Sequence, residues 1–246
     1  MEDLEKRARE RRERRKRERT RQIRIQITAF ICIVILIIST IIIVRSINKN
    51  RLKEEAMQSE VSAIKYVANE PPLNVDLLDI NDYSRPGTAI DQVNGIVVHY
   101  TANPGTSAQQ NRDYFNSLAE TKETHASSQF IIGLDGEIVQ CVPCNEIAYA
   151  SNDRNNDTVS IECCIEDETG KFNEKTYRSL VWLTTWLMGR YDLNSEDVIR
   201  HYDVTGKNCP KYYVENPKEW DKFKDDLLEY IDLNGVEKEI TLEESI

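Results

Sequence analysis

The chain has 246 residues, of which 30% are charged, and its net charge at pH 7 is −10. This length allows one ordinary domain with extensions. The charge is unevenly distributed, because residues 1–24 hold twelve Lys and Arg against six Asp and Glu. The acidic remainder argues against a nucleic-acid-binding surface there, since phosphate contacts need Lys and Arg.

An apolar segment follows the basic run. Residues 25–44 are twenty residues without a charge, dominated by Ile, Val and Leu. A helix of this length spans about 30 Å, the thickness of the hydrocarbon core of a bilayer. A cleavable signal peptide has a shorter apolar region followed by small residues, whereas this segment ends in Ile-Val before Arg45. We therefore predict a retained, single transmembrane helix over residues 25–44.

The flanking charges predict how this helix is oriented. Twelve cations precede the apolar segment, and only Arg45 and Lys49 follow it closely. The positive-inside rule then places residues 1–24 in the cytoplasm as a basic segment. The expected localisation is the cell membrane, with a single pass and an extracellular folded domain.

The rest of the chain divides into three parts. Residues 45–72 are mostly polar and end in two prolines, which is typical of a stem or linker. Residues 73–234 carry the strand and helix patterns of one folded domain. Residues 235–246 form an acidic tail after Asn234.

Four segments of the folded domain have strand patterns. They are apolar runs with β-branched residues, at 95–101, 129–133, 137–142 and 158–165. The turn at residues 134–136, Leu-Asp-Gly, indicates a hairpin between the second and third of them.

Three segments have helix patterns. Ser107 begins a capping-box sequence, and residues 172–191 carry apolar side chains at helical spacing. A last helix is expected from Asn216, with Pro217 in its first turn. The order of the elements predicts an α/β fold, with a mixed central β-sheet flanked by about three helices and preceded by the transmembrane helix.

Residues 200–210 concentrate chemically reactive groups. His201, Lys207 and Cys209 lie within nine residues, in a segment rich enough in turn residues that we do not expect a helix. Imidazole and thiolate are preferred zinc ligands. Another of the three histidines, His99, lies near the carboxyl end of the strand at 95–101, where sheet proteins commonly display site residues. Two His and one Cys leave one coordination position open, as in catalytic zinc sites, but each residue alone also has an ordinary structural explanation.

A family resemblance decides between these interpretations. Residues 94–105, 159–164 and 201–210 resemble the type 2 N-acetylmuramoyl-L-alanine amidases, zinc enzymes related to phage amidase lysozymes and peptidoglycan recognition proteins. The resemblance covers about residues 94–230, and its specific part is the motif His-x(5)-Lys-x-Cys-Pro.

The resemblance implies a role for five side chains. It implies that His99, His201 and Cys209 hold Zn2+ and that Lys207 stabilises the developing oxyanion. Glu162 matches the position at which cell-wall members of the family carry a carboxylate general base. The metal would acidify a water molecule and polarise the amide carbonyl.

The sequence departs from the family pattern in two places. Residues 127–130 are Ser-Ser-Gln-Phe where several members have Tyr-His or Ala-His, so more of the catalysis rests on Glu162. Residues 148–151 are Ala-Tyr-Ala-Ser where Trp-His is usual, which leaves the substrate contacts of that loop undefined. We interpret His125 as an exposed loop histidine, and the alternative is that it lines the cleft.

Four further cysteines have two interpretations. Cys141 and Cys144 form one pair and Cys163 and Cys164 another. The adjacent Cys163 and Cys164 would bridge each other only with strain. A link between the two pairs is compatible with an oxidising exterior, and buried free thiols are the alternative.

The predicted function is that of a membrane-anchored extracellular peptidoglycan hydrolase. The zinc-dependent reaction would cleave the amide bond between N-acetylmuramic acid and L-alanine, with peptidoglycan as the partner, no nucleic acid and a monomeric ectodomain. Three alternatives stay open: a non-catalytic peptidoglycan-binding protein of the same fold, a Cys–His peptidase with Cys209 as nucleophile, and a membrane scaffold acting through residues 1–24.

Overall fold

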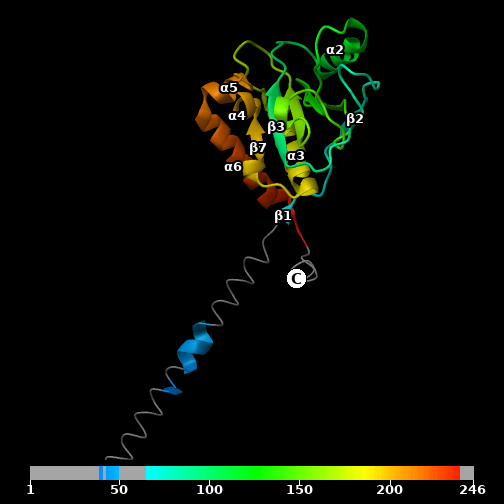
Figure 1. Cartoon of the computed structure of the whole chain (residues 1–246). Helices are drawn as coiled ribbons and strands as arrows, with labels where there is room; N and C mark the ends of the chain where they lie inside the picture. Colours follow the sequence, from blue (N-terminus) through cyan, green and yellow to red (C-terminus); the bar gives the residue numbers. More distant parts are fainter. Residues whose placement is uncertain (1–38, 41–42, 50–64, 239–246) are drawn as a thin grey trace, which may run out of the picture. The chain divides into compact units, whose positions relative to one another are not determined.

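The structure, a computed structural model, describes residues 39–40, 43–49 and 65–238 (Figure 1). The predicted cytoplasmic segment and most of the predicted transmembrane segment lie outside these residues. Among the residues that are described, no helix is both long enough and apolar enough to cross a membrane. The transmembrane helix therefore stays a prediction. The chain divides into two compact units, residues 1–63 and 64–246, and the second is the folded unit.

A six-stranded mixed sheet forms the centre of this unit. Its strand order is β2-β5-β4-β6-β3-β7. The strands are β2 (Leu73–Val75), β3 (Gly95–Tyr100), β4 (Phe130–Ile132), β5 (Ile138–Gln140), β6 (Thr158–Cys163) and β7 (Val198–Arg200). Strands β4, β6, β3 and β7 run parallel, and β5 runs antiparallel to β4 and parallel to β2.

Four of the six strands were predicted from the sequence. The predicted hairpin is confirmed as β4 and β5, and the runs at 95–101 and 158–165 are confirmed as β3 and β6. Strands β2 and β7 were not predicted. Each is three residues long and only partly buried, so neither leaves a detectable periodicity in the sequence.

Three long helices cover the sheet. They are α2 (Ala108–Thr121), α3 (Glu174–Tyr191) and α6 (Pro217–Asn234). The capping box at Ser107 is confirmed, because its side chain accepts from the Gln110 N–H and the Gln110 side chain accepts from the Ser107 N–H. The predicted α/β class with a mixed sheet and about three flanking helices is confirmed for the folded unit.

Several short elements complete the unit. They are β1 (Lys65–Tyr66), η1 (Asn152–Arg154), η2 (Ser195–Asp197), α4 (His201–Thr205), α5 (Lys211–Glu215) and β8 (Val236–Glu237), with β1 and β8 paired antiparallel. The expectation of no helix within 200–210 was wrong. Helix α4 forms there, and the carboxylate of Asp203, its third residue, accepts the backbone N–H of Arg200 at 2.8 Å and stabilises the first turn.

Two apolar cores lie on the two faces of the sheet. On one face, Ile96, Val98 and Ile161 belong to a core that includes the buried side chains of α3 and α6. On the other face, Ile131 and Val139 belong to a core that includes Phe115 and Leu118 of α2. Figure 1 shows α2 well separated from α6. Because side chains alternate along a strand, the residue between Val98 and Tyr100, which is His99, points toward the α2 face.

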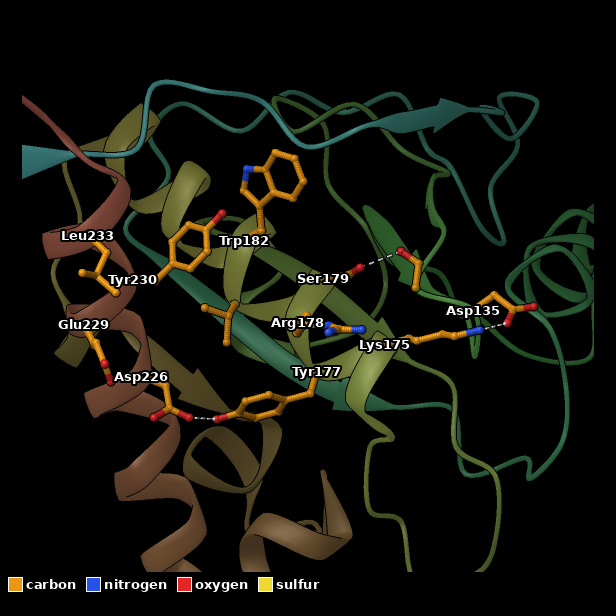
Figure 2. A pocket seen from close by; sticks show the side chains of 12 residues that line it. Asp135, Lys175, Tyr177, Arg178, Ser179, Trp182, Asp226, Glu229, Tyr230 and Leu233 are labelled. Carbon is orange, nitrogen blue, oxygen red and sulfur yellow. Dashed lines mark hydrogen bonds and ion pairs between the residues drawn. The ribbon is translucent and has the colours of Figure 1, made fainter.

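A groove of about 600 Å³ lies between α3 and α6 (Figure 2). The Tyr177 hydroxyl donates to Asp226 at 2.6 Å across it, and Lys175 pairs with Asp135 at 2.7 Å. Trp182 and Tyr230 supply apolar walls. The described residues that line this groove include no histidine and no cysteine, so it contains none of the three predicted metal ligands.

Candidate active site

The register of two parallel strands places His99 beside Glu162. Strand β3 pairs with β6 so that His99 lies opposite Glu162, one residue before each strand ends. Both side chains therefore leave the sheet on the α2 face, at the carboxyl edge of the strands. His99 is buried, with 1% of its surface exposed.

A tight reversal after β7 brings Cys209 back to His201. Helix α4 begins at His201 and is capped after Thr205 by Gly206, whose φ of 77° lies in the left-handed region that glycine adopts without strain. The chain then turns, and the Tyr202 N–H donates to the Cys209 carbonyl at 2.9 Å. His201 and Cys209 are both buried as a result.

These elements bring the three predicted ligands together. The ligand atoms of His99, His201 and Cys209 all lie within 4.8 Å of one another, and the Cys209 Sγ is 3.8 Å from the His99 Nδ1. The Nδ1 of His201 is buried and has no hydrogen-bond partner among the described residues. Ligand atoms around a tetrahedral zinc are separated by roughly 3.5 Å, so the cluster fits a metal ion of this size.

The electrostatics of the cluster also suit a cation. Burial lowers the pKa of His99, and His201 and Lys207 lower it further. The pKa of His201 is also lowered, mainly by burial and to a smaller extent by the charge of Lys207. Both imidazoles are therefore neutral at pH 7, the form that binds metals. Burial raises the pKa of the Cys209 thiol to about 12, so a positive charge between the three groups is needed to stabilise the thiolate.

A cleft of about 470 Å³ opens onto the cluster and contains two further predicted residues, Glu162 and Lys207. The Glu162 Oε2 is buried and has no hydrogen-bond partner among the described residues. Burial raises the pKa of Glu162 to about 8, while the Lys207 ammonium acts in the opposite direction. The cleft thus combines a cluster of three side chains that could hold a metal ion, a carboxyl group whose pKa lies near neutral, and a cation.

The family of N-acetylmuramoyl-L-alanine amidases matches residues 89–212, half of the chain. The matched region includes β3, β6, α4 and all five of these side chains. The chain belongs to the N-acetylmuramoyl-L-alanine amidase family.

Individual relatives agree with this assignment. The N-acetylmuramoyl-L-alanine amidase CwlL of Bacillus licheniformis is 34% identical over 161 residues, which are 61% of this chain and 44% of the relative. The amidase BlyA of Bacillus subtilis strain 168 is 30% identical over 168 residues, 60% of this chain and 44% of the relative. This amidase-family chain therefore spans less than half the length of these two curated relatives.

Solved structures support the same fold. The catalytic domain of XlyA superimposes with a TM-score of 0.55 and 29% identity, covering 64% of this chain and 99% of that domain. PlyL superimposes with a TM-score of 0.56 at 21% identity, covering 64% of this chain and 97% of that one. The amidase fold thus accounts for the compact unit that carries the cluster.

The loop that departs from the family pattern contacts both histidines. The Ser151 Oγ lies 3.2 Å from the His99 Nε2, and the Asn152 Oδ1 lies 3.0 Å from the His201 Nε2. Neither residue was predicted from the sequence as part of the site. The sequence did carry one sign that this loop is unusual: residues 148–151 are Ala-Tyr-Ala-Ser, where the sequence comparison with the family expected Trp-His.

His125 is exposed and also lines the mouth of the cleft. Its ring stacks on Tyr83 with centroids 4.9 Å apart, and the Tyr149 ring meets it edge-on at 5.3 Å. The two interpretations of His125 are therefore compatible, because its loop forms part of the cleft wall.

The remaining cysteines of the folded unit lie outside the cluster. Cys141, Cys144, Cys163 and Cys164 are all buried free thiols. Of the two interpretations left open by the sequence, the structure has the free thiols and not the link between pairs.

Proposed function

We propose that this chain is a zinc-dependent N-acetylmuramoyl-L-alanine amidase that hydrolyses the amide bond between N-acetylmuramic acid and L-alanine in peptidoglycan. One observation carries the proposal: three metal-binding atoms within 4.8 Å of one another lie in the same cleft as Glu162 and Lys207. The names of the curated relatives indicate the bond, although the chain spans only 44% of CwlL and of BlyA.

The three ligand side chains would hold the metal. The Nδ1 of His99 lies near the Cys209 Sγ, and the Nδ1 of His201 is buried without a partner among the described residues, so both nitrogens are available to a cation. A bound zinc ion would lower the pKa of a water molecule and polarise the scissile carbonyl. The chain itself must then handle the proton of that water and the charge on the carbonyl oxygen.

Glu162 handles the proton. Its carboxylate accepts a proton from the attacking water as the carbon–oxygen bond forms, and it then donates that proton to the L-alanine nitrogen as the carbon–nitrogen bond breaks. The products are the free lactyl carboxyl group of the muramic acid and a free amino group on the stem peptide. The pKa of Glu162, raised by burial to about 8, suits both halves of this exchange.

Lys207 stabilises the negative charge that develops on the carbonyl oxygen. It lies in the same cleft and lowers the pKa of His99, His201 and Glu162 through its charge. Lys207 is exposed at the border of the cleft, and a positive charge there favours the charged transition state over the neutral amide.

Cys209 is poorly suited to act as a nucleophile. Catalytic cysteines have a depressed thiol pKa and are partly exposed. Here burial raises the pKa of Cys209 to about 12, and only 2% of its surface is exposed. These observations favour the metal hydrolase over the Cys–His peptidase. The complete set of ligands, base and cation likewise favours an enzyme over a non-catalytic peptidoglycan-binding protein.

The test is hydrolysis of purified peptidoglycan by the full chain in detergent. We expect new stem-peptide amino groups to appear without new reducing sugars, the activity to be lost with a chelator, and zinc to restore it. Absence of released amino groups from the zinc-loaded protein would refute the enzyme. Activity that survives the chelator but not thiol alkylation would support the peptidase instead.

We also propose that residues 25–44 anchor the protein in the cell membrane and leave the cleft outside the cell. The absence of charge from these twenty residues and the excess of cations ahead of them support this placement.

A further inference from the structure

We propose that Ser151 and Asn152 are positioning residues that hold the two imidazoles with their Nδ1 atoms directed at the metal. The proposal rests on one part of the proposed function, the binding of a metal ion by His99, His201 and Cys209, and does not depend on hydrolysis. Two consecutive residues of one loop thereby orient ligands that come from two separate elements, β3 and α4.

The first contact leaves the His99 Nδ1 free for a metal ion when Ser151 donates its hydrogen to Ser160. The Ser151 Oγ lies 3.2 Å from the His99 Nε2 and 2.9 Å from the Ser160 Oγ. A serine hydroxyl has one hydrogen to donate. When Ser151 donates it to Ser160, it accepts the Nε2–H of His99. The Nδ1 of His99, on the Cys209 side, is then left with a free lone pair.

The second contact does the same for His201. The Asn152 Oδ1 lies 3.0 Å from the His201 Nε2. A carboxamide oxygen only accepts hydrogen bonds, so the Nε2 must be the protonated nitrogen. The opposite nitrogen, Nδ1, is the buried atom without a partner among the described residues. An unpartnered buried acceptor is costly, and a metal ion at this position would satisfy it.

The loop is itself fixed to the fold. The Asn155 Oδ1 accepts the backbone N–H groups of Ala150 at 3.1 Å and of Ser151 at 2.6 Å. Ser151 is fully buried, and Ser160 belongs to β6, the strand beside His99. The two hydrogen-bond partners of the histidines are therefore held by contacts of their own loop and of the sheet, which reduces the free-energy cost of ordering the ligands on metal binding.

The test measures zinc affinity in the full chain. Zinc binding by competition with a chromophoric chelator should weaken about 10- to 100-fold in Ser151→Ala and in Asn152→Gly, the range for lost outer partners of a metal-bound histidine. The glycine is chosen because Asn152 has a φ of 51°, which glycine adopts freely, so the variant removes the side chain and preserves the backbone. In Co2+-substituted protein, the ligand-field absorption bands should shift in both variants.

Two controls separate positioning from general stability. Asn152→Asp retains an acceptor oxygen for the His201 Nε2 and should bind zinc close to wild type. Ser128→Ala removes another fully buried serine hydroxyl, which bonds to the Phe130 carbonyl at 2.9 Å rather than to a histidine. It should also leave zinc affinity unchanged.

Thermal unfolding with and without zinc makes the result decisive. The proposal is supported if each variant, without zinc, melts close to the wild-type temperature and zinc raises that temperature by less than it does in wild type. Wild-type zinc affinity in both variants overturns the proposal, as does an equal loss of melting temperature with and without zinc. Because hydrolysis is not measured, a chain that binds zinc through these contacts yet lacks amidase activity would contradict only the proposed function.

Discussion

At the scale of single residues, the cleft combines a buried carboxyl group with an exposed cation. Glu162 is a strand carboxylate, but its Oε2 is buried and its pKa is raised to about 8. Lys207 is an exposed cation, and it lines the same cleft as the clustered side chains of His99, His201 and Cys209. Substitutions at these two positions separate proton transfer from charge stabilisation.

Replacing Glu162 with Gln should lower kcat about 10²- to 10⁴-fold, because the amide cannot accept the proton of the attacking water. Zinc content, measured by elemental analysis, should stay at one equivalent, since Glu162 is not among the three clustered ligands. An unchanged kcat in a zinc-loaded variant would mean that another group is the base.

Replacing Lys207 with Met should lower kcat about 10²- to 10³-fold with a small change in KM, because the charge acts on the transition state more than on the bound substrate. The measurement is steady-state hydrolysis of a soluble muramyl peptide. Lys207→Arg retains the charge and should keep part of the activity. A variant that changes KM alone would show that Lys207 binds substrate and takes no part in the chemistry.

At the scale of secondary-structure elements, helix ends and strand ends determine local stability. Helix α2 has a complete capping box at its start, but the residue that caps its end, Lys122, has a φ of 54°. A side chain in the left-handed conformation is strained by its Cβ, and glycine avoids that strain. Strands β5 and β6 are each followed by a buried cysteine, Cys141 and Cys164. Ionisation of these thiols at alkaline pH should destabilise the ends of the two strands.

Replacing Lys122 with Gly should raise the free energy of unfolding by about 0.5–1 kcal/mol, because glycine accepts the left-handed cap. Urea denaturation measures the change. Lys122→Ala removes the same charge and keeps the Cβ, so it should not gain this stability. If both substitutions raise the free energy of unfolding equally, the gain comes from loss of the lysine charge and not from the backbone conformation.

The buried thiols predict a loss of stability at alkaline pH. Burial raises the pKa of Cys141 to about 12, that of Cys144 to about 11 and that of Cys164 to about 12, from a usual value of 9.0. A raised pKa means that the folded state retains the proton longer than the unfolded state. The contribution of each thiol to stability is therefore complete below about pH 9 and is lost as the pH rises toward 11–12.

Urea denaturation between about pH 7 and pH 10.5 should show this loss, with a limiting slope of about 1.4 kcal/mol per pH unit for each thiol. The free energy of unfolding of Cys164→Ala should be lower than that of wild type at every pH in this range, but it should fall less steeply as the pH rises. Identical slopes in the two proteins would exclude Cys164 as a contributor.

At the scale of the whole molecule, the proposed anchor would bring the cleft to its substrate. In cells, we expect the full chain to sediment with membranes and to be released by detergent but not by high salt. A chain with Ile35 and Ile37 both replaced by Lys should leave the membrane fraction, because each lysine at the centre of the bilayer costs about 2.5–3.5 kcal/mol. Protease added to intact protoplasts should digest the folded unit. Salt extraction of the wild type would contradict the anchor.

The sequence by itself determined the elements and the candidate ligands whose signals are local. Apolar runs and capping residues marked four strands and three long helices, and His201, Lys207 and Cys209 lie within nine residues of one another. Such patterns are readable because each depends on neighbours along the chain. The membership of this chain in the amidase family followed from motifs of the same local kind.

Only the tertiary structure decided the contacts between distant segments. The place of Glu162 beside His99 depends on the register of β3 and β6. Ser151 meets His99 across 52 residues of sequence, and Asn152 meets His201 across 49. Strands β2 and β7 are too short to show a pattern, and each extends the sheet by pairing with a neighbouring strand, β5 and β3 respectively. Hydrogen bonds of this kind leave no periodicity in the sequence, so their partners become visible only once the chain is folded.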